Sequence, residues 1–256
     1  MRVVGIIPAR LQSTRLPRKL LLNATGKPLI QYVWETAVQC RELTDVIVAT
    51  DSEEIAEAVR WFGGRAEMTG EHPSGTDRIA EVTRRCCSDA DVIVNLQGDE
   101  PELDPEIVTS LVREIQSSGS PMATVAAPMS SAAAVRDPSC VKVVLDVNGR
   151  AMYFSRHPIP FTRDRAVEEY FRDGETNPWL LHVGLYAYRR DFLLRLTTMP
   201  PSPLEQLEKL EQLRALQSGA AISVAVVNHA TAGIDTPEDY AAFMRRMGVF
   251  ERRRAA

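Results

Sequence analysis

The sequence predicts an α/β protein with a mostly parallel sheet and helices on both faces of that sheet. Short apolar runs rich in β-branched residues predict buried strands at 3–8, 46–50 and 92–96. Segments with apolar residues at helical spacing lie between them, as at 29–38 and 53–62. This alternation of strand and helix is typical of parallel sheets, because parallel neighbours are joined by a crossover that is usually a helix.

The first predicted strand leads into a basic loop. We expect Pro8 to end the strand, because proline has no backbone donor for a β-ladder. The loop beyond it carries cations with hydroxyls between them, namely Arg10, Ser13, Thr14, Arg15, Arg18 and Lys19. Loops at the carboxyl ends of parallel strands bind ligands, and guanidinium and ammonium groups suit phosphate oxygens. The loop is therefore either a polyphosphate site or a solvated charge run, and by itself it favours neither.

The next elements continue the pattern. After the strand at 46–50, Asp51-Ser52-Glu53-Glu54 predicts a helix start, because a capping oxygen precedes acidic residues in the first turn. Gly63-Gly64 predicts the end of that helix, and 65–68 predicts a short third strand. A polar loop is expected from Glu71 to Arg78, followed by a helix to about Cys86.

The strand at 92–96 leads directly into Gln97-Gly98-Asp99-Glu100-Pro101. Mg²⁺ takes one or two carboxylates together with phosphate oxygens and water, so Asp99 beside a basic loop could bring a metal to a triphosphate. Gly98 would allow close approach of the backbone to the ligand. The alternative is that Asp99 only caps the next helix, which is expected at 105–115 before a strand at 122–126.

The second half has a different pattern. Asn148-Gly149 between apolar runs at 141–146 and 151–154 is a strong hairpin signal. Residues 158–179 are rich in proline, charge and aromatics, which predicts a long loop, and long loops in compact domains are often functional. Another strand is expected at 182–188.

The last third supplies one helix, one strand and a final helix. Leucines at 204, 207, 210, 213 and 216 predict a single amphipathic helix over 204–216, and 222–227 predicts the last strand. Asp235-Thr236-Pro237 begins the final helix, since proline and acids are favoured in a first turn. Asp235 is either a second metal ligand or the N-cap. Pattern alone favours the N-cap. The two roles are compatible if the Asp235 carboxylate lies at the edge of the helix.

Several polar residues of these segments have a functional and a structural interpretation. Arg156, at the end of the second hairpin strand, could hold a substrate carboxylate or face solvent. His182 and Tyr186 are four apart on a strand and therefore share a face, but a lone strand histidine is more often structural than catalytic. The segment from His72 to Thr76 suits recognition of a base edge, although by itself it is only a turn.

Composition narrows the class of protein. A chain of 256 residues that is 45% hydrophobic and 25% charged is ordinary for a soluble globular protein. A net charge of -4 argues against nucleic-acid or anionic-membrane binding through bulk charge. The four cysteines form no C-x-x-C pair, and no apolar run has bilayer-spanning length, so we expect a cytoplasmic protein with reduced thiols. The absence of the P-loop and dinucleotide glycine motifs disfavours those two nucleotide-binding classes.

A family resemblance rests on six motifs in order. They are I-I-P-A-R-L-x-S-T-R-L-P-x-K, H-P-S-G-T-D-R, V-N-L-Q-G-D-E-P, V-K-V-V-L-D-x-x-G-x-A-M-Y-F-S-R, P-S-P-L-E-Q-x-E-x-L-E-Q-L-R and G-I-D-T-P-E-D. Together they resemble the 3-deoxy-manno-octulosonate (Kdo) cytidylyltransferases, or CMP-Kdo synthetases, over residues 3 to about 247. The resemblance implies a Rossmann-like nucleotidyltransferase fold with a smaller β-hairpin subdomain for sugar binding and dimerisation.

The resemblance also implies roles for individual residues. Those that would hold the CTP phosphates are Arg10, Ser13, Arg15 and Lys19. Those along the cytosine and ribose are His72, Ser74 and Arg78, and those that would hold Mg²⁺ are Asp99 and Asp235. Those that would line the sugar-acid pocket are Gln97, Arg156, His182, Tyr186 and Glu211. Two departures from the family pattern, Leu20 after the lysine and Leu185-Tyr186-Ala187 on the last-but-one strand, remove none of these groups.

The implied reaction is in-line attack of the sugar acid's anomeric hydroxyl on the α-phosphorus of CTP, with loss of pyrophosphate and activation of the sugar for lipopolysaccharide synthesis. The implied protein is a Mg²⁺-dependent homodimer of a single nucleotidyltransferase domain over 1–256, with 1–130 mainly binding CTP and 131–220 mainly binding the sugar and the second subunit. Two alternatives stay open. One is a cytidylyltransferase for another sugar acid, such as sialic acid or an amino analogue of Kdo. The other is a nucleotide-binding regulator without activity.

Overall fold

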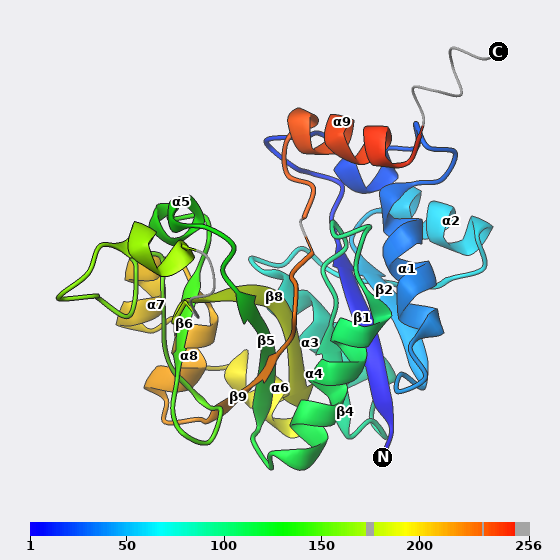
Figure 1. Cartoon of the computed structure of the whole chain (residues 1–256). Coiled ribbons are helices and arrows are strands. Elements are labelled where there is room, and N and C mark those ends of the chain that lie inside the picture. The colour runs from blue at the N-terminus through cyan, green and yellow to red at the C-terminus, as the bar shows by residue number, and fades with distance from the viewer. Residues whose placement is uncertain (173–176, 232, 249–256) are drawn as a thin grey trace. The chain divides into compact units, whose positions relative to one another are not determined.

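A computed structural model describes residues 1–172, 177–231 and 233–248 of the chain. These residues form two compact units, one from residues 1–109 together with residues from 231 onward, and one from residues 110–230. Both are mixed α/β (Figure 1). The predicted fold class, an α/β protein with a mostly parallel sheet and helices, is confirmed.

The first unit contains four parallel strands in the order β3-β2-β1-β4. Their bounds are β1 Val3–Ala9, β2 Asp45–Thr50, β3 Arg65–Met68 and β4 Val92–Asn95. In register, Ile6 of β1 lies opposite Ile47 of β2 and Asn95 of β4. The apolar side chains of β1, β2 and β4 are buried on both faces, as the continuous β-branched runs predicted.

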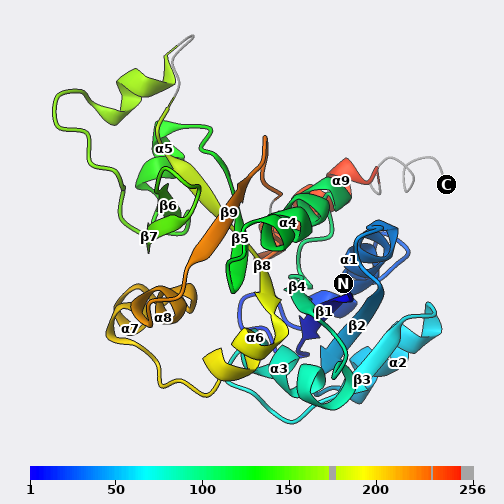
Figure 2. The same cartoon turned by 90° about the horizontal axis from the view of Figure 1, so that it is seen from below.

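Helices cover both faces of these strands. Their bounds are α1 Leu29–Gln39, α2 Glu53–Trp61, α3 Gly75–Cys86 and α9 Pro237–Arg246, with the short 3₁₀ turn η1 at Lys19–Leu21. The helices α1 and α2 lie on one side of β1 and α3 lies on the other (Figures 1 and 2). Trp34 of α1 and Phe62 after α2 are in ring contact at 5.2 Å, which holds the first two helices together. The helix α4, Pro105–Ser117, includes the boundary between the two units.

The strand β1 continues through Pro8 to Ala9, so the prediction that Pro8 ends it is wrong. The pairing explains why proline is tolerated there. The ladder between β1 and β4 ends at Ile6, whereas the ladder between β1 and β2 continues to Ala9. The oxygen of Ile6 accepts a bond from Leu96 on the β4 side. Since backbone groups alternate along a strand, the missing donor of Pro8 faces the β4 side, where β4 has already ended.

The second unit contains the antiparallel part of the fold. The strands of this unit are β5 Met122–Pro128, β6 Lys142–Leu145, β7 Ala151–Ser155, β8 Leu180–Arg189 and β9 Ile222–Val226. Here β5 pairs with β8 antiparallel and with β9 parallel, while β6 pairs antiparallel with β7 and β8. The predicted hairpin is the β6–β7 pair, and Gly149 has the positive φ of 74° that its turn requires.

The helices of the second unit are short. They are α5 Ala132–Arg136, η2 Val167–Phe171, α6 Arg190–Leu196, α7 Pro203–Glu208 and α8 Gln212–Gln217. The long loop predicted at 158–179 contains the 3₁₀ turn η2 and ends before β8, which begins at Leu180. Residues 173–176 of that loop lie outside the described residues.

The single helix predicted over 204–216 is wrong, because the chain breaks into α7 and α8 at Lys209, whose φ is 55°. The leucine spacing explains the break. A strict spacing of three falls short of the helical repeat of about 3.6 residues, so the leucines of one continuous helix would rotate away from a common face. Leu207 is 81% exposed, whereas Leu210 and Leu213, at and beyond the break, are buried.

None of the helices in the described part of the chain is both long and apolar enough to span a membrane.

Candidate active site

Lys19 lies at the centre of a cluster of charged groups in the first unit. Its Nζ donates to Asp99 Oδ2 at 2.5 Å, to Asp235 Oδ1 at 2.9 Å and to the Ile234 carbonyl at 3.1 Å. Burial alone would lower the pKa of Lys19, but the charges and hydrogen bonds of Asp99 and Asp235 raise it above its ordinary value. The lysine is therefore a firmly charged cation, and the two predicted metal ligands lie on either side of it.

Asp99 is positioned by the end of β4. The strand stops at Asn95, and Gly98 brings the backbone against the end of β1, where an added Cβ would lie 3.3 Å from Ile7 Cγ2 and 3.4 Å from the Pro8 oxygen. A larger residue would therefore displace the turn that carries Asp99. The carboxylate of Asp99 bonds Lys19 and is not the cap that the alternative interpretation proposed.

Asp235 is not the N-cap of α9. That role belongs to Thr236, whose hydroxyl accepts a bond from Asp239 N at 3.1 Å while Asp239 Oδ2 accepts from Thr236 N at 2.9 Å. The cap leaves the Asp235 carboxylate to accept from Lys19 and from Arg15 Nη2, the latter at 2.8 Å. The segment is also tied to the turn after β4 by a bond of 2.8 Å from Ile234 N to the Asp99 carbonyl.

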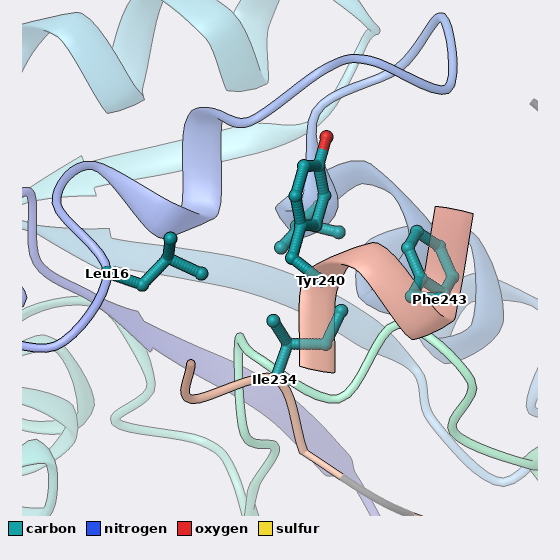
Figure 3. Close-up of a cluster of buried hydrophobic side chains, with 5 residues drawn as sticks. Leu16, Ile234, Tyr240 and Phe243 are labelled. Carbon is teal, nitrogen blue, oxygen red and sulfur yellow. The ribbon is translucent and has the colours of Figure 1, made fainter. Parts of the chain in front are cut away.

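A hydrophobic cluster fixes this arrangement (Figure 3). Leu16 from the basic loop, Ile234 before α9, and Tyr240 and Phe243 on α9 face one another, together with Leu29 at the start of α1. The Tyr240 hydroxyl accepts a bond from Ala24 N at 2.9 Å. Residues from both ends of the sequence thus bury one apolar surface, which holds the basic loop beside Asp235.

The remaining cations of the basic loop face outward. Arg10 is exposed, Ser13 is half-buried, and Arg18 adopts a left-handed φ of 55° while its guanidinium pairs with Glu54. A non-glycine residue in that region is uncommon, and here it precedes the η1 turn that begins with Lys19.

The cluster has the donor groups that a divalent cation takes beside phosphate. Two carboxylates at one place, beside cations that suit phosphate, match the way Mg²⁺ is bound through one or two carboxylates and substrate phosphates. Among residues 1–172, 177–231 and 233–248, no group of three or more histidine, cysteine, aspartate or glutamate side chains is placed to hold a metal ion. The donor set therefore fits a metal that arrives with a polyphosphate.

The predicted base-side residues lie at the beginning of α3. Ser74 is the N-cap, with its hydroxyl 3.1 Å from Asp77 N, so the predicted loop ends at 74 and residues 75–78 are helical. Arg78 is 4% exposed, and its guanidinium donates to Asp51 Oδ2 at 2.6 Å and to Thr69 Oγ1 at 2.5 Å. Its guanidinium therefore holds the ends of β2 and β3.

His72 and the helix start lie close to the end of β1. His72 Nε2 is 2.6 Å from Glu81 Oε2, and this bond lowers the pKa of Glu81 below its ordinary value. An added Cβ on Gly75 would lie 3.2 Å from the Pro8 ring. The first turn of α3 therefore abuts the strand that leads into the basic loop, and Gln97 leaves β4 near the same end.

In the second unit, His182 and Tyr186 lie on one face, as their spacing predicted, and their rings are also in contact. Their ring centroids are 5.4 Å apart, and the ring of Phe154 of β7 lies nearly perpendicular to that of His182, with the centroids 4.9 Å apart. Burial lowers the pKa of His182 to about 3 and raises the pKa of Tyr186 well above its ordinary value. Both side chains are therefore neutral, and Glu211, just before α8, is close enough to add to the shift at Tyr186.

Arg156 is held by main-chain oxygens. Its Nε donates to the Glu208 carbonyl at 2.7 Å, and its Nη1 donates to the Pro138 carbonyl at 2.9 Å. The Arg156 carbonyl in turn accepts from the buried Lys142 Nζ at 2.5 Å, which also bonds the Cys140 carbonyl. A role for Arg156 in binding a sugar carboxylate stays a prediction, and its guanidinium already connects α7 to the loop before β6.

Some residues that shape these clusters were not found by sequence reasoning. Thr236, the true cap, could have been recognised from the Thr-x-x-Asp spacing. Lys142 could have been recognised as a charge inside an apolar strand run. Glu100, which is 8% exposed, accepts a bond from Thr231 Oγ1, and burial raises its pKa to about 7. Thr124, which bonds His182, carries no signal in an apolar strand of small residues.

The fold is that of an α/β protein in which a basic loop, Asp99 and Asp235 meet at Lys19. Comparison with known proteins agrees and is more specific. The family model described as cytidylyltransferase matches residues 4–222. The chain is 49% identical to the 3-deoxy-manno-octulosonate cytidylyltransferase of Syntrophobacter fumaroxidans, over 94% of this chain and 95% of that protein. It is 44% identical to the protein of the same name from Geobacter sulfurreducens, over 96% and 100%.

A solved structure gives the same result. The structure of CMP:2-keto-3-deoxy-manno-octonic acid synthetase complexed with CTP is 41% identical, covers 99% of this chain and 100% of its own, and superposes with a TM-score of 0.86. The chain therefore belongs to the cytidylyltransferase family and, within it, to the 3-deoxy-manno-octulosonate cytidylyltransferases.

Proposed function

We propose that this chain transfers CMP from CTP to the anomeric hydroxyl of 3-deoxy-D-manno-octulosonate, giving CMP-Kdo and pyrophosphate and activating the sugar acid for lipopolysaccharide synthesis. Membership of the family supports the substrate pair. The single observation in the structure that supports the chemistry most is Lys19 between Asp99 and Asp235, because it gathers a phosphate-binding cation and two metal-binding carboxylates in one unit.

The sugar acid supplies the nucleophile in this reaction. Its anomeric oxygen bonds the α-phosphorus of CTP in line, the bond from that phosphorus to the β-phosphate oxygen breaks, and pyrophosphate carries away the electron pair. The hydroxyl proton leaves in the same step and ends on water or on the released pyrophosphate. No covalent intermediate with the protein is required, so the protein acts by alignment and by neutralising charge.

Cations of the basic loop are proposed to hold the triphosphate. Lys19 and Arg15 already face Asp235, and Arg10 and Ser13 lie on the same loop. When a triphosphate enters, its oxygens can replace the carboxylates as partners of these cations, because phosphate carries more negative charge and accepts forked bonds from arginine. Asp99 and Asp235 are then released from Lys19 and would hold Mg²⁺ beside the phosphates.

Bound Mg²⁺ supplies charge neutralisation on the phosphate oxygens. The carboxylates of Asp99 and Asp235 bind and orient it, and the structure fixes them independently, one after β4 and one before α9.

The remaining predicted residues are assigned by the family resemblance. His72, Ser74 and Arg78 are proposed to lie along the nucleoside, with Ser74 and Arg78 acting through the first turn of α3. Gln97, Arg156, His182, Tyr186 and Glu211 are proposed to line the sugar-acid pocket. Neutral His182 and Tyr186 suit the hydroxyl groups of a sugar better than its carboxylate.

A homodimer in the cytoplasm is part of the proposal. Nucleoside triphosphates are supplied in that compartment, and the second unit exposes large apolar side chains on β7 and α7, with Met152 at 63% and Leu207 at 81% exposed. Light scattering on the purified chain measures the mass directly. A mass near twice that of the chain is expected, and a monomer across the accessible concentrations would overturn the dimer.

Pyrophosphate release tests the proposed reaction. The chain is incubated with CTP, Mg²⁺ and one acid at a time: 3-deoxy-manno-octulosonate, its amino analogue or sialic acid. The fastest release is expected with 3-deoxy-manno-octulosonate, and reactions without acid, or with UTP in place of CTP, are the controls. Faster release with another acid would assign the chain to that acid. CTP binding without release for any acid would favour the non-catalytic regulator.

A further inference from the structure

The hydroxyl of Thr124 lies between His182 and the distorted part of β8. Thr124 is fully buried on β5, and the register with β8 shifts directly after it: Thr124 pairs with Tyr186, whereas Val125 pairs with Val183. Two residues, Gly184 and Leu185, therefore form a bulge. Because the insertion is of two residues, it preserves the alternation of side chains and leaves His182 and Tyr186 on one face.

The bulge determines where the Thr124 proton points. Thr124 Oγ1 is 2.8 Å from the Leu185 carbonyl oxygen and 3.3 Å from the Val183 carbonyl oxygen. Two oxygens approach to 2.8 Å favourably only with a proton between them, and a carbonyl has none. The single hydroxyl proton of Thr124 therefore points to the Leu185 carbonyl.

The direction of that proton fixes the tautomer of His182. Thr124 Oγ1 is 3.0 Å from His182 Nε2, and with its proton already committed the oxygen can only accept. His182 Nε2 therefore carries a hydrogen and donates it to Thr124. In a neutral imidazole the other nitrogen, Nδ1, is then an acceptor. No side chain or carbonyl in the described part of the chain bonds Nδ1.

We propose that Thr124 is a positioning residue that holds His182 in the Nε2–H tautomer, so that Nδ1 accepts a hydrogen bond from a hydroxyl group of the sugar acid. This inference rests on the proposed function, which assigns His182 to the sugar-acid pocket. The ring is held in orientation by the rings of Phe154 and Tyr186, whose centroids lie 4.9 Å and 5.4 Å from its own, so Nδ1 points in one direction. His182 stays neutral because burial holds its pKa at about 3.

The tautomer decides which substrate group His182 can contact. A lone-pair acceptor repels the sugar carboxylate and attracts a hydroxyl donor. The opposite tautomer, or an imidazolium, would donate at Nδ1 and would attract the carboxylate. His182 therefore recognises a hydroxyl, and the carboxylate must bind cationic or other donor groups.

NMR of the ligand-free protein with isotope-labelled histidine tests the tautomer without any substrate. The chain has four histidines, and the His182 signals are assigned by their loss in His182→Asn. We expect a protonated Nε2 and an unprotonated Nδ1 with no titration between about pH 5 and 8, the range in which an ordinary histidine titrates. A protonated Nδ1, or an imidazolium that forms in this range, would overturn the inference even if the enzyme makes CMP-Kdo.

Two variants of Thr124 test its role. Thr124→Ser keeps the hydroxyl and should keep the tautomer, whereas Thr124→Val removes the hydroxyl at nearly the same volume and should give a mixture of tautomers. Loss of one oriented hydrogen bond should raise the KM for the sugar acid roughly tenfold in Thr124→Val, with the KM for CTP unchanged and Thr124→Ser close to wild type. A changed tautomer with an unchanged sugar-acid KM would overturn the role in substrate binding. If Thr124→Val does not fold, Thr124→Ala removes the same hydroxyl, and its tautomer and sugar-acid KM make the same comparison with Thr124→Ser.

Failure of the proposed reaction and failure of the His182 tautomer give different results. If no acid gives pyrophosphate, the proposed function fails while the tautomer measurement stands by itself. If pyrophosphate is released, analogues of the sugar acid that each lack one hydroxyl are compared in wild type and in His182→Ala. If His182 pairs with a hydroxyl, removal of that hydroxyl should raise the KM in wild type but not in His182→Ala. If every analogue raises the KM equally in both proteins, no hydroxyl pairs with His182, and the inference fails while the proposed function stands.

Discussion

Lys19 Nζ lies 2.5 Å from Asp99 Oδ2, although 80 positions separate the two residues in the sequence. The same nitrogen bonds Asp235, which is 216 positions away. Three segments therefore meet at one ammonium group: the loop after β1, the turn after β4 and the segment before α9. A cation in this place balances two carboxylates that would otherwise repel each other.

Removal of this cation should change metal binding. In Lys19→Met the paired carboxylates lose their counter-charge, so the CTP-free protein should bind Mn²⁺ roughly tenfold more tightly, because both carboxylates become available to a divalent ion. The affinity for CTP should fall roughly tenfold to hundredfold, since a charge-assisted phosphate contact is lost. Electron paramagnetic resonance measures free Mn²⁺, and calorimetry measures CTP binding.

Arg18→Met is the matched control, because Arg18 lies in the same loop but pairs with Glu54. It should leave Mn²⁺ binding in the absence of CTP unchanged. Equal Mn²⁺ affinity in Lys19→Met and wild type would mean that Lys19 does not compete with the metal.

Two adjacent residues before α9 have different roles: Thr236 caps the helix, and Asp235 bonds Lys19. Thr236→Ala should lower the free energy of unfolding by about 1 kcal/mol, because an N-cap hydroxyl is lost. Thr236→Ser should retain most of that stability. Asp235→Asn should change the unfolding free energy little, since its carboxylate does not cap the helix. Thermal and urea unfolding measure all three, and an Asp235→Asn loss as large as that of Thr236→Ala would restore Asp235 as the cap.

Arg156→Ala should affect the sugar acid more than CTP. Its guanidinium bonds main-chain carbonyls of Glu208 and Pro138, so truncation leaves those oxygens without a donor and loosens α7. We expect a KM for the sugar acid raised roughly tenfold and a small loss of stability. Arg136→Ala, in an exposed pair with Glu168, is the control and should change neither. A shift in the CTP KM alone would show that the sugar pocket is wrongly assigned.

The pair of Glu205 and Arg214 predicts a pH dependence of stability. Burial alone would raise the pKa of Glu205, but the hydrogen bonds and charge of Arg214, with a distance of 2.5 Å from Arg214 Nη2 to Glu205 Oε1, lower it below its ordinary value. A carboxyl with a lowered pKa in the folded state stabilises the fold above its unfolded pKa, and this stabilisation is lost as the pH falls through the folded value.

Glu205→Gln should therefore lower the unfolding free energy by about 3 kcal/mol near neutral pH, as expected when one partner of a largely buried pair is removed. The difference from wild type should shrink as the pH is lowered below the ordinary range of glutamate. Glu53→Gln, in an exposed pair with Arg60, is the control and should differ little at any pH. A difference that is constant with pH would exclude the ion pair as its cause.

Sequence patterns predicted the strands and most helices of the first unit, because buried parallel strands and amphipathic crossovers are encoded locally. The break at Lys209 was missed, since leucines at a spacing of three mimic a helical face over a short window. Extension of β1 through Pro8 was also missed, because it depends on where β4 ends and not on proline itself.

The candidate site was only partly predictable for a similar reason. The chemistry of Lys19, Asp99 and Asp235 was suggested by residue type and by position after strands. Their actual partners depend on tertiary packing, as in the cluster of Leu16, Ile234 and other apolar side chains (Figure 3). Thr124 was unpredictable, because its role arises from a bulge in the strand opposite it.

Asp99 and Asp235 are proposed to hold the metal-bound triphosphate together. Calorimetric titration with CTP, with and without Mg²⁺, tests it most directly in wild type, Asp99→Asn and Asp235→Asn, with Glu102→Gln as the control for charge. Mg²⁺ should tighten CTP binding in wild type and in the control. Each aspartate variant should lose that gain, and its turnover should fall roughly a hundredfold or more while its circular dichroism stays native. A folded Asp99→Asn or Asp235→Asn with an undiminished Mg²⁺-dependent gain would contradict the claim.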